Sequence, residues 1–202
     1  EGVDTLEQVV VGDAAAAAEE FVRIRGFRMA VTRELATARQ WLRDASRDEL
    51  RPGLVASSGA LRHRAYGLEL DSGFLRPYPI DKWFLSGRSD VRSSHQLEVA
   101  MREFDIQGLE LDYVGVCWGD DLTRCPDDLA WNFRAFRGTK WQIANGPERQ
   151  QYLLNKYRVL LTRAREGLIV WVPRGDAGDP TREPARMDRT ADYLIRCGLP
   201  LI

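Results

Sequence analysis

Four short apolar segments limit the fold of this chain more than any other feature. They span residues 54–58, 97–101, 113–118 and 168–172, and the third is almost wholly apolar and rich in β-forming side chains. A strand that is apolar along its whole length is typical of a sheet covered on both faces, because no alternate residue has to face water. With the helix-forming stretches between them, these segments predict an open, mostly parallel α/β sheet.

Helical spacing of apolar residues marks three stretches around these strands. They cover residues 14–42, 150–165 and 185–197. Gly26 is expected to break the first of these helices, and a further helix is expected after Gly59. Gly167 and Gly198 stand where glycine commonly caps a helix C-terminus, so they are expected to end the other two helices.

The segments outside these elements are expected to be irregular. Residues 1–12 mix polar and apolar side chains without a clear period, and residues 71–92 are rich in Gly, Pro, Ser and Asp. The latter composition predicts a long ordered loop. Residues 131–136 alternate in polarity, as an edge strand of a hairpin does, and residues 175–184 resemble a linker.

Length and composition indicate one globular domain. The chain has 202 residues, of which 44% are hydrophobic and 29% charged, which excludes a disordered protein. No apolar run approaches roughly 18 residues and no signal peptide opens the chain, so we expect a cytoplasmic protein without a membrane partner. Three irregularly spaced cysteines fit free thiols in a reducing compartment. The chain begins at Glu1 rather than Met, as a fragment of a longer product would.

The charge pattern leaves two interpretations open. The formal net charge is −1, which argues against a domain coated for nucleic acid. All 29 basic residues except Lys82, Lys140 and Lys156 are arginine. This bias reflects either the base composition of the genome or the use of guanidinium groups to bind phosphate.

In such a sheet the ligand site lies at the carboxyl ends of the strands, and three segments are expected to occupy that kind of position. Residues 57–64 put small side chains at a helix N-terminus, which suits either an anion site with Arg62 or Arg64 or a plain capped helix. Residues 103–112 crowd four carboxylates around one glycine, and spacing alone favours turn capping over cation or ribose binding. Residues 160–167 place two arginines at a helix end, where cations are favourable in any case.

The order of these segments resembles that of known helicase motifs. Residues 103–114 resemble motif V of superfamily-one helicases, and residues 157–165, centred on Thr-Arg-Ala, resemble motif VI. Residues 54–64 are similar to motif IV. The closer likeness is to an uncharacterised bacterial P-loop family related to the helicase half of Schlafen proteins, in which a strand ends in Trp-Gly-Asp-Asp, as at residues 118–121 here.

The resemblance covers about residues 20–200 and implies a RecA-like three-layer α/β fold with a mostly parallel sheet. Residues 1–202 would then form one domain, the second lobe of a helicase, with a helical lead-in over 1–45 and a linker and C-terminal helix over 175–202. Such a lobe closes over ATP that the first lobe holds. The expected function is that of the C-terminal motor lobe of an ATP-dependent DNA or RNA helicase or translocase.

The resemblance also implies roles for individual residues. Arg163 would be the arginine finger that meets the γ-phosphate, where a permanently charged planar donor stabilises the charge that spreads over the phosphoryl oxygens. Arg62, or less directly Arg64, would be the motif IV phosphate contact. Arg165 would be structural.

Two further groups of residues receive roles from the same likeness. Glu110 would approach the ribose or the nucleotide, Gly108 would allow close approach of the backbone, and Gln107 would couple nucleotide to nucleic acid. Ser94 and His95 would touch a nucleic-acid backbone. Apart from that, His95 and the other histidine, His63, are expected to be exposed.

The sequence departs from a complete motor in one respect. A phosphate loop of the form GxxxxGK[ST] is absent from its 202 residues. The chain alone is therefore not expected to hydrolyse ATP; ATP and Mg²⁺ would bind only when a first RecA-like lobe, in cis or in trans, completes the site. Single-stranded DNA or RNA would be the other partner, and no metal site of its own is expected.

Two other classes of function remain possible at this point. The chain could be a free-standing, non-catalytic module that binds nucleic acid or protein, as the missing phosphate loop suggests. It could also be an enzyme that uses the carboxylates of residues 103–112, although no nucleophile or metal cluster accompanies them.

Overall fold

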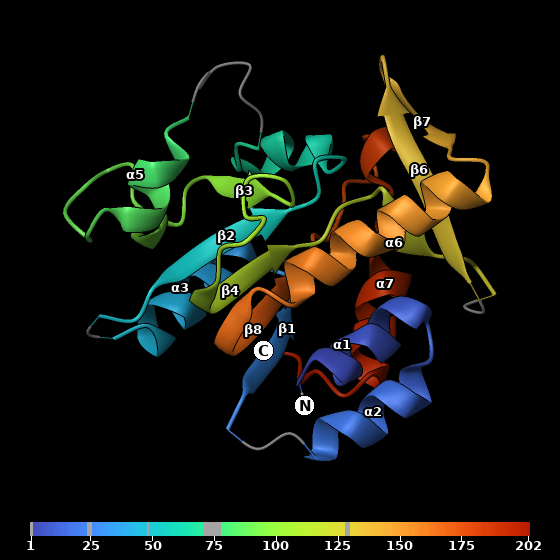
Figure 1. Cartoon of the computed structure of the whole chain (residues 1–202). Helices are drawn as coiled ribbons and strands as arrows, with labels where there is room; N and C mark the ends of the chain where they lie inside the picture. The colour runs from blue at the N-terminus through green and yellow to red at the C-terminus, as the bar shows by residue number, and fades with distance from the viewer. Residues whose placement is uncertain (1, 24–25, 48, 71–77, 128–129) are drawn as a thin grey trace.

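A parallel sheet forms the centre of the molecule (Figure 1). The computed structural model describes residues 2–23, 26–47, 49–70, 78–127 and 130–202. The sheet has five strands in the order β1-β8-β4-β2-β3, and every neighbouring pair is parallel. Its strands are β1 (Arg28–Thr32), β2 (Pro52–Ala56), β3 (Ala100–Arg102), β4 (Leu111–Cys117) and β8 (Ala164–Trp171). The α/β, three-layer fold with a parallel sheet is therefore confirmed.

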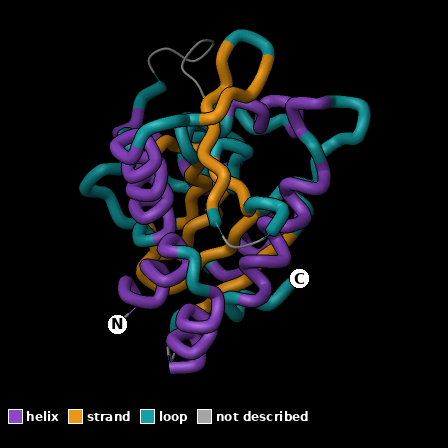
Figure 2. The backbone as a smooth tube through the Cα atoms, turned by 90° about the vertical axis from the view of Figure 1, so that its right-hand side faces the viewer, coloured by secondary structure: helices purple, strands orange, loops and turns teal. Residues whose placement is uncertain are grey.

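Helices cover both faces of this sheet (Figure 2). Helix α3 (Leu35–Ala45) packs on one face. The other face carries the helices α1 (Gly2–Val11), α2 (Ala14–Arg23), α6 (Pro147–Leu161) and α7 (Pro184–Arg196). Successive side chains of a strand point to opposite faces, so Val114 and Val116 join the core under α6 and α7, whereas Tyr113 and Cys117 join the core under α3. Because both faces of these strands are buried, the strands appear in the sequence as continuous apolar runs.

A second, antiparallel sheet stands beside the first. Its strands β5 (Leu122–Arg124), β6 (Trp131–Arg137) and β7 (Lys140–Ile143) follow one another in space. The hairpin β6–β7 projects beyond the central sheet, at the upper right of Figure 1. The expected hairpin strand over 131–136 is confirmed, but it is the middle strand of this sheet and not an edge strand.

The amino-terminal third departs from the sequence expectation in two places. Residues 1–12 were expected to be irregular, but Gly2–Val11 form α1. Helical structure was expected to resume after a break at Gly26 and to reach residue 42, but Arg28–Thr32 form β1. The backbone of Val31 bonds to Pro200 and to Ile202, and β1 pairs along its length with β8. Pairing with residues more than 130 positions away makes this segment a strand. The local spacing of apolar residues contains no information about that distant partner.

The expected C-terminal cap at Gly167 is also wrong. Helix α6 ends at Leu161, and the chain enters β8 three residues later, at Ala164. Gly167 lies inside that strand, opposite Arg28 and Tyr113. A Cβ atom on Gly167 would lie 2.5 Å from the carbonyl oxygen of Arg28, so close strand packing, rather than helix capping, requires glycine here.

The segments between the strands contain more regular structure than expected. Of the predicted loop over 71–92, residues 71–77 lie outside the described residues, and Ile80–Leu85 form the short helix α5. The 3₁₀ helix η2 (Ser94–Gln96) ends at Leu97, whose φ of 58° is left-handed, and β3 therefore begins at Ala100 rather than at residue 97. After Gly59 the chain forms the 3₁₀ helix η1 (Leu61–Tyr66).

The carboxyl-terminal part is integrated into the domain. The expected helix α7 is confirmed, and Gly198, with φ of 102°, follows its end. The segment 175–184 contains the 3₁₀ helix η3 (Pro180–Arg182) and packs on the hairpin, where the Trp141 ring donates to the Thr181 carbonyl at 2.7 Å. Within the described ranges, no helix combines the length and the apolar character needed to cross a membrane.

Candidate functional site

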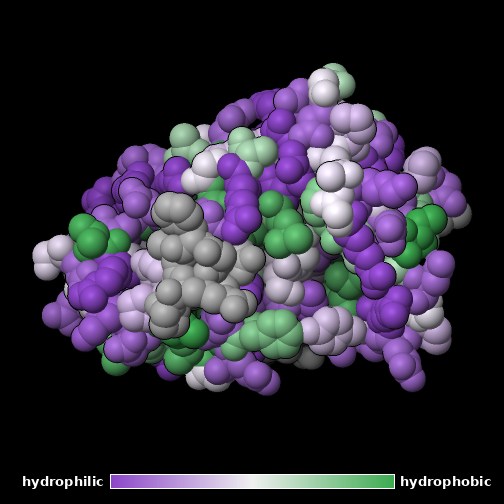
Figure 3. Space-filling view, turned by 90° about the horizontal axis from the view of Figure 1, so that it is seen from above, coloured by the Kyte–Doolittle hydropathy of each residue, from purple (hydrophilic) through white to green (hydrophobic). Residues whose placement is uncertain are grey.

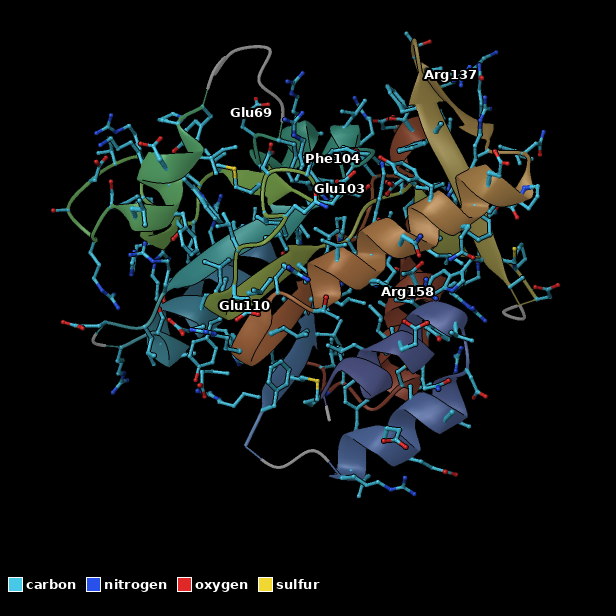
Figure 4. All side chains as sticks on the ribbon, viewed as in Figure 1. Glu69, Glu103, Phe104, Glu110, Arg137 and Arg158 are labelled. Atoms are coloured by element: carbon cyan, nitrogen blue, oxygen red, sulfur yellow. The ribbon has the colours of Figure 1, made fainter. Side chains whose placement is uncertain are left out.

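The parallel sheet gathers its loops at two opposite edges. We call the edge where β2, β4 and β8 begin the amino edge, and the edge where they end the carboxyl edge. Seven residues of β4 separate the two, which corresponds to about 20 Å. Figure 4 shows the connection from β3 to β4 running between them, with Glu103 near the carboxyl edge and Glu110 at the amino edge.

The motif V-like and motif VI-like segments meet at the amino edge, and the expectation that they lie at the carboxyl ends of the strands is wrong, because Glu110 precedes β4 and Arg163 precedes β8. Because β4 and β8 are neighbours, the backbone N–H of Leu111 donates to the carbonyl of Arg163 at 2.9 Å. Glu110 and Arg165 form an ion pair of 2.9 Å across the same strands. The fold therefore brings Glu110 and Arg163 to one surface from positions 53 residues apart in sequence.

Arg163 lies where helix α6 turns into β8. Its Nε donates to the carbonyl of Val159 at 3.1 Å, and its Nη2 lies 3.4 Å from Oγ1 of Thr162. A cation at this helix end is favourable because the last carbonyls carry a partial negative charge. No acidic side chain among the described residues forms an ion pair with Arg163.

The turn before β4 presents an open backbone at the same edge. Gly108 has φ of 82°, and a Cβ atom there would meet nothing within 4 Å. Glycine is thus needed for the left-handed turn and not for packing. Gln107 and Glu110 on either side of it are exposed. The predicted nucleotide-binding residues of this segment are therefore accessible together.

Ser94 and His95 lie on η2, beside the start of β2. Ser94 is 1% exposed, and its hydroxyl makes no hydrogen bond within the described part of the chain. The hydroxyl of Ser93 lies 3.0 Å from Nδ1 of His95, and burial together with Arg51 and Arg88 lowers the pKa of His95. In this conformation Ser94 offers no surface to nucleic acid, and contact by His95 stays a prediction.

The motif IV-like segment lies at the other edge. Arg62 of η1 forms an ion pair of 2.6 Å with Asp179, and its guanidinium lies 5.7 Å from the centre of the Phe136 ring. Arg64 pairs with Glu69. The structure therefore does not bring Arg62 together with Arg163, because η1 follows the carboxyl end of β2.

The expectation that His63 is exposed is wrong. His63 is 2% exposed, and its Nε2 lies 3.1 Å from the carbonyl oxygen of Cys117. Burial lowers the pKa of His63 to about 4, so the ring is neutral at physiological pH and can donate to that carbonyl. It is a core residue under Trp171, whose ring centre is 5.0 Å away.

A buried polar network at the carboxyl edge was not foreseen. Asp121, which is fully buried, accepts hydrogen bonds from the hydroxyls of Ser57 and Tyr157, the latter at 2.6 Å. The N–H of Gly119 donates to the Tyr157 hydroxyl at 3.1 Å. Burial raises the pKa of Asp121, and the two hydroxyl donors oppose that shift. A side chain on Gly59 would clash with this carboxylate, which explains the glycine at this position.

A second part of this network reaches the surface. Lys156 lies 3.1 Å from Oε1 of Glu103 and 2.7 Å from the hydroxyl of Ser58. Glu103 also accepts from the backbone N–H of Ser58 at 2.7 Å. We call Ser57, Ser58, Glu103, Asp121, Lys156 and Tyr157 the carboxyl-edge network. Two consecutive aspartates directly after an apolar strand were the available sequence signal for it.

The four carboxylates of residues 103–112 do not converge on one site. Glu103 binds the carboxyl-edge network, whereas Asp105 pairs with Arg102 and Glu110 with Arg165. Asp112 accepts from the backbone N–H of Arg51 at 2.6 Å. Each group thus ties down a turn or a strand end, in agreement with the capping interpretation. In the described ranges, no three His, Cys, Asp or Glu side chains are grouped so that they could hold a metal ion.

Comparison with known proteins places the domain in a family. The family model of the Schlafen group 3 DNA/RNA helicase domain matches residues 3–174. No curated protein matches the chain. The matched range contains all five strands of the central sheet, both edges and the carboxyl-edge network. The chain belongs to the Schlafen group 3 DNA/RNA helicase domain family.

Proposed function

We propose that this domain is the C-terminal motor lobe of an ATP-dependent DNA or RNA helicase or translocase. The observation that carries the proposal is the family match together with the meeting of Arg163, Gly108 and Glu110 at the amino edge. A first RecA-like lobe, in the same polypeptide or in another, supplies the phosphate loop that holds ATP and Mg²⁺. Single-stranded DNA or RNA is the track.

In this proposal the amino edge faces the nucleotide. Arg163 leaves its hydrogen bonds at the end of α6 and turns toward the γ-phosphate when the lobes close. Its guanidinium is planar and always charged, so it stabilises charge on the phosphoryl oxygens without a proton transfer. The open backbone at Gly108 admits close approach, Glu110 binds the ribose, and Gln107 relays the state of the nucleotide to the track.

The test is ATP turnover by the domain combined with a first lobe that carries the phosphate loop. Arg163→Ala is expected to reduce turnover by about 10³-fold or more, while nucleotide affinity stays within several-fold. Arg174→Ala is the matched control, because Arg174 is a 67% exposed arginine paired with Glu34 at the opposite edge. Turnover of Arg163→Ala equal to that of the control would refute the finger assignment.

A second candidate is a free-standing module that binds nucleic acid or protein without catalysis. The absence of a phosphate loop from the 202 residues favours it. The two candidates differ in one measurement: the non-catalytic module gives no ATPase activity with any first lobe and binds nucleic acid equally with and without nucleotide. A phosphate-driven mode of binding also has to weaken as salt is raised.

A further inference from the structure

A cavity opens at the carboxyl edge, between the β6–β7 hairpin and helix α6. Its volume is about 280 Å³. Residues of the hairpin and of α6 form its walls, and Ser58 and Gly59 contribute to its lining. Figure 3 looks onto the end of the molecule that carries the hairpin and shows mostly hydrophilic residues with smaller hydrophobic patches among them. None of the roles proposed above uses this cavity.

The wall of the cavity is mostly apolar and carries a few charged groups. Arg134, Arg149 and Lys156 line it, and Asp121 is the acidic residue of the same lining. Asp121 is occupied within the protein by Ser57 and Tyr157. Arg134 is only 5% exposed, and its Nε has no hydrogen-bond partner within the described residues. Its Nη2 donates to Thr123, and the carboxylates of Asp120, Asp121 and Glu183 act on its charge, so what the guanidinium lacks is one hydrogen-bond acceptor at Nε. An unsatisfied buried donor is costly, and a phosphate oxygen can supply that acceptor.

Two exposed aromatic rings stand at the rim of the cavity. Phe104 is 56% and Tyr152 is 48% exposed, and their ring centres are 6.4 Å apart with planes 33° from parallel. The Nζ of Lys156 lies 5.0 Å from the centre of the Tyr152 ring. Figure 4 shows Phe104 beside Glu103 at this edge, and Arg137 on the projecting hairpin. Aromatic faces and cations thus alternate over a short distance.

We propose that this cavity and its aromatic rim, the carboxyl-edge groove, bind single-stranded nucleic acid. Bases stack on Phe104 and Tyr152, because every base has a flat π-face that such rings accept. A backbone phosphate lies beside Arg149, and another accepts the hydrogen bond that the buried Nε of Arg134 does not make within the described residues. This inference rests on the proposed function and names the part of the domain that holds the track.

The occupant follows from the presence of exposed flat rings beside exposed cations, of which Arg149 forms no ion pair within the described residues. An acidic peptide would use the cations but leave the two exposed rings without flat partners, whereas a nucleic-acid strand supplies a phosphate and a base at each step. The exposed Arg137 and Lys140 at the turn of the hairpin extend the positive charge along the path of such a strand. Nucleic acid would then contact the edge of the sheet opposite to Arg163.

The experiment measures binding of fluorescein-labelled dT20 and rU20 to residues 1–202 by anisotropy, without nucleotide. Tyr152→Ala is expected to raise Kd by about 5- to 100-fold, and Tyr152→Phe, which keeps the ring, to stay within about 2-fold. Arg149→Ala is expected to weaken binding and to reduce the slope of log K against log salt by about one. Arg43→Ala, an exposed arginine of α3 on the other face, is the matched control and leaves Kd unchanged.

The outcomes separate this inference from the motor assignment. Strands carrying 5-iodouracil are expected to photo-cross-link to Phe104 or Tyr152. Cross-links confined to the region of His95, with Kd unchanged in Tyr152→Ala and Arg149→Ala, would move the track to the amino edge and overturn the inference. Lack of binding to both strands at 50 mM salt, about the lower end of the usual range, would overturn it as well. The turnover test on Arg163 is decided independently in either case.

Discussion

Removal of one hydroxyl, in Tyr157→Phe, tests whether the carboxyl-edge network stabilises the domain. Tyr157 is fully buried, and its hydroxyl donates to Oδ1 of Asp121 and accepts from the N–H of Gly119. The substitution keeps the ring and its packing on Trp118, whose ring centre is 4.5 Å away. It leaves one buried carboxylate oxygen and one buried N–H without their partner.

The expected cost follows from these two losses. A buried donor or acceptor left unsatisfied costs about 1–3 kcal/mol, and a hydrogen bond to a charged acceptor contributes about 1.5–3 kcal/mol. Because both bonds share one oxygen and the site can relax in part, we expect the free energy of unfolding to fall by about 2–4 kcal/mol. The cost should be larger at pH 8 than at pH 5, because loss of the donor raises the pKa of Asp121 further and the ionised form is then less stable.

Urea unfolding followed by tryptophan fluorescence measures this free energy, with Trp118 as a reporter beside the site. Tyr152→Phe is the matched control, since Tyr152 lies on the same helix and is 48% exposed. It is expected to change stability by less than about 0.5 kcal/mol. A Tyr157→Phe variant that unfolds at the same urea concentration as this control would show that the network does not contribute as argued.

Two further substitutions probe other parts of the domain. Gly167→Ala puts a Cβ atom 2.5 Å from the carbonyl oxygen of Arg28, and we expect it to lower the free energy of unfolding in urea by about 2–3 kcal/mol. Gly87→Ala is the control and is expected to leave this free energy unchanged, because its Cβ atom would meet nothing within 4 Å. Equal stability of the two variants would contradict the packing argument. Burial raises the pKa of Asp120 from 3.8 to about 7, so the wild type loses stability as pH rises from about 4 to about 7. Asp120→Asn should remove this contribution to the pH dependence of the free energy of unfolding. The variant should therefore be more stable than the wild type at pH 8 but not at pH 4. A stability difference that is the same at both pH values would refute the assignment.

The sequence predicted a strand or helix correctly where the burial of its side chains follows one regular local pattern. The apolar run before Trp118 predicted β4, because residues that face both cores are apolar at every position. Helix α7 was predicted as well, since its buried side chains recur at helical spacing and Gly198 follows it in a left-handed conformation. Such patterns are local, so a single sequence contains them.

The sequence misled where a distant segment decides the conformation. Apolar residues around Met29 and Ala30 fit a helix as well as a strand, and only the bonds of β1 to β8 and to the carboxyl terminus make it a strand. Gly167 has the composition of a cap, but its role is to let two strands approach. His63 could not be assigned to the core, because the strand that buries it ends more than 50 residues later.

For the candidate site, the order of the motif-like segments along the chain and the positions of their residues in space support different conclusions. The motif-like segments in their order predicted the family to which the chain belongs. The sequence alone determined the buried strands β2, β4 and β8, the helices α6 and α7 and that membership, because these depend on residue types and on neighbours in the chain. Only the tertiary structure decided that Arg163 and Glu110 share one edge while Arg62 lies at the other, and that Asp121, Ser57 and Tyr157 meet in the interior. The direction of parallel strands sets those edges, and hydrogen bonds between strands far apart in sequence set the direction.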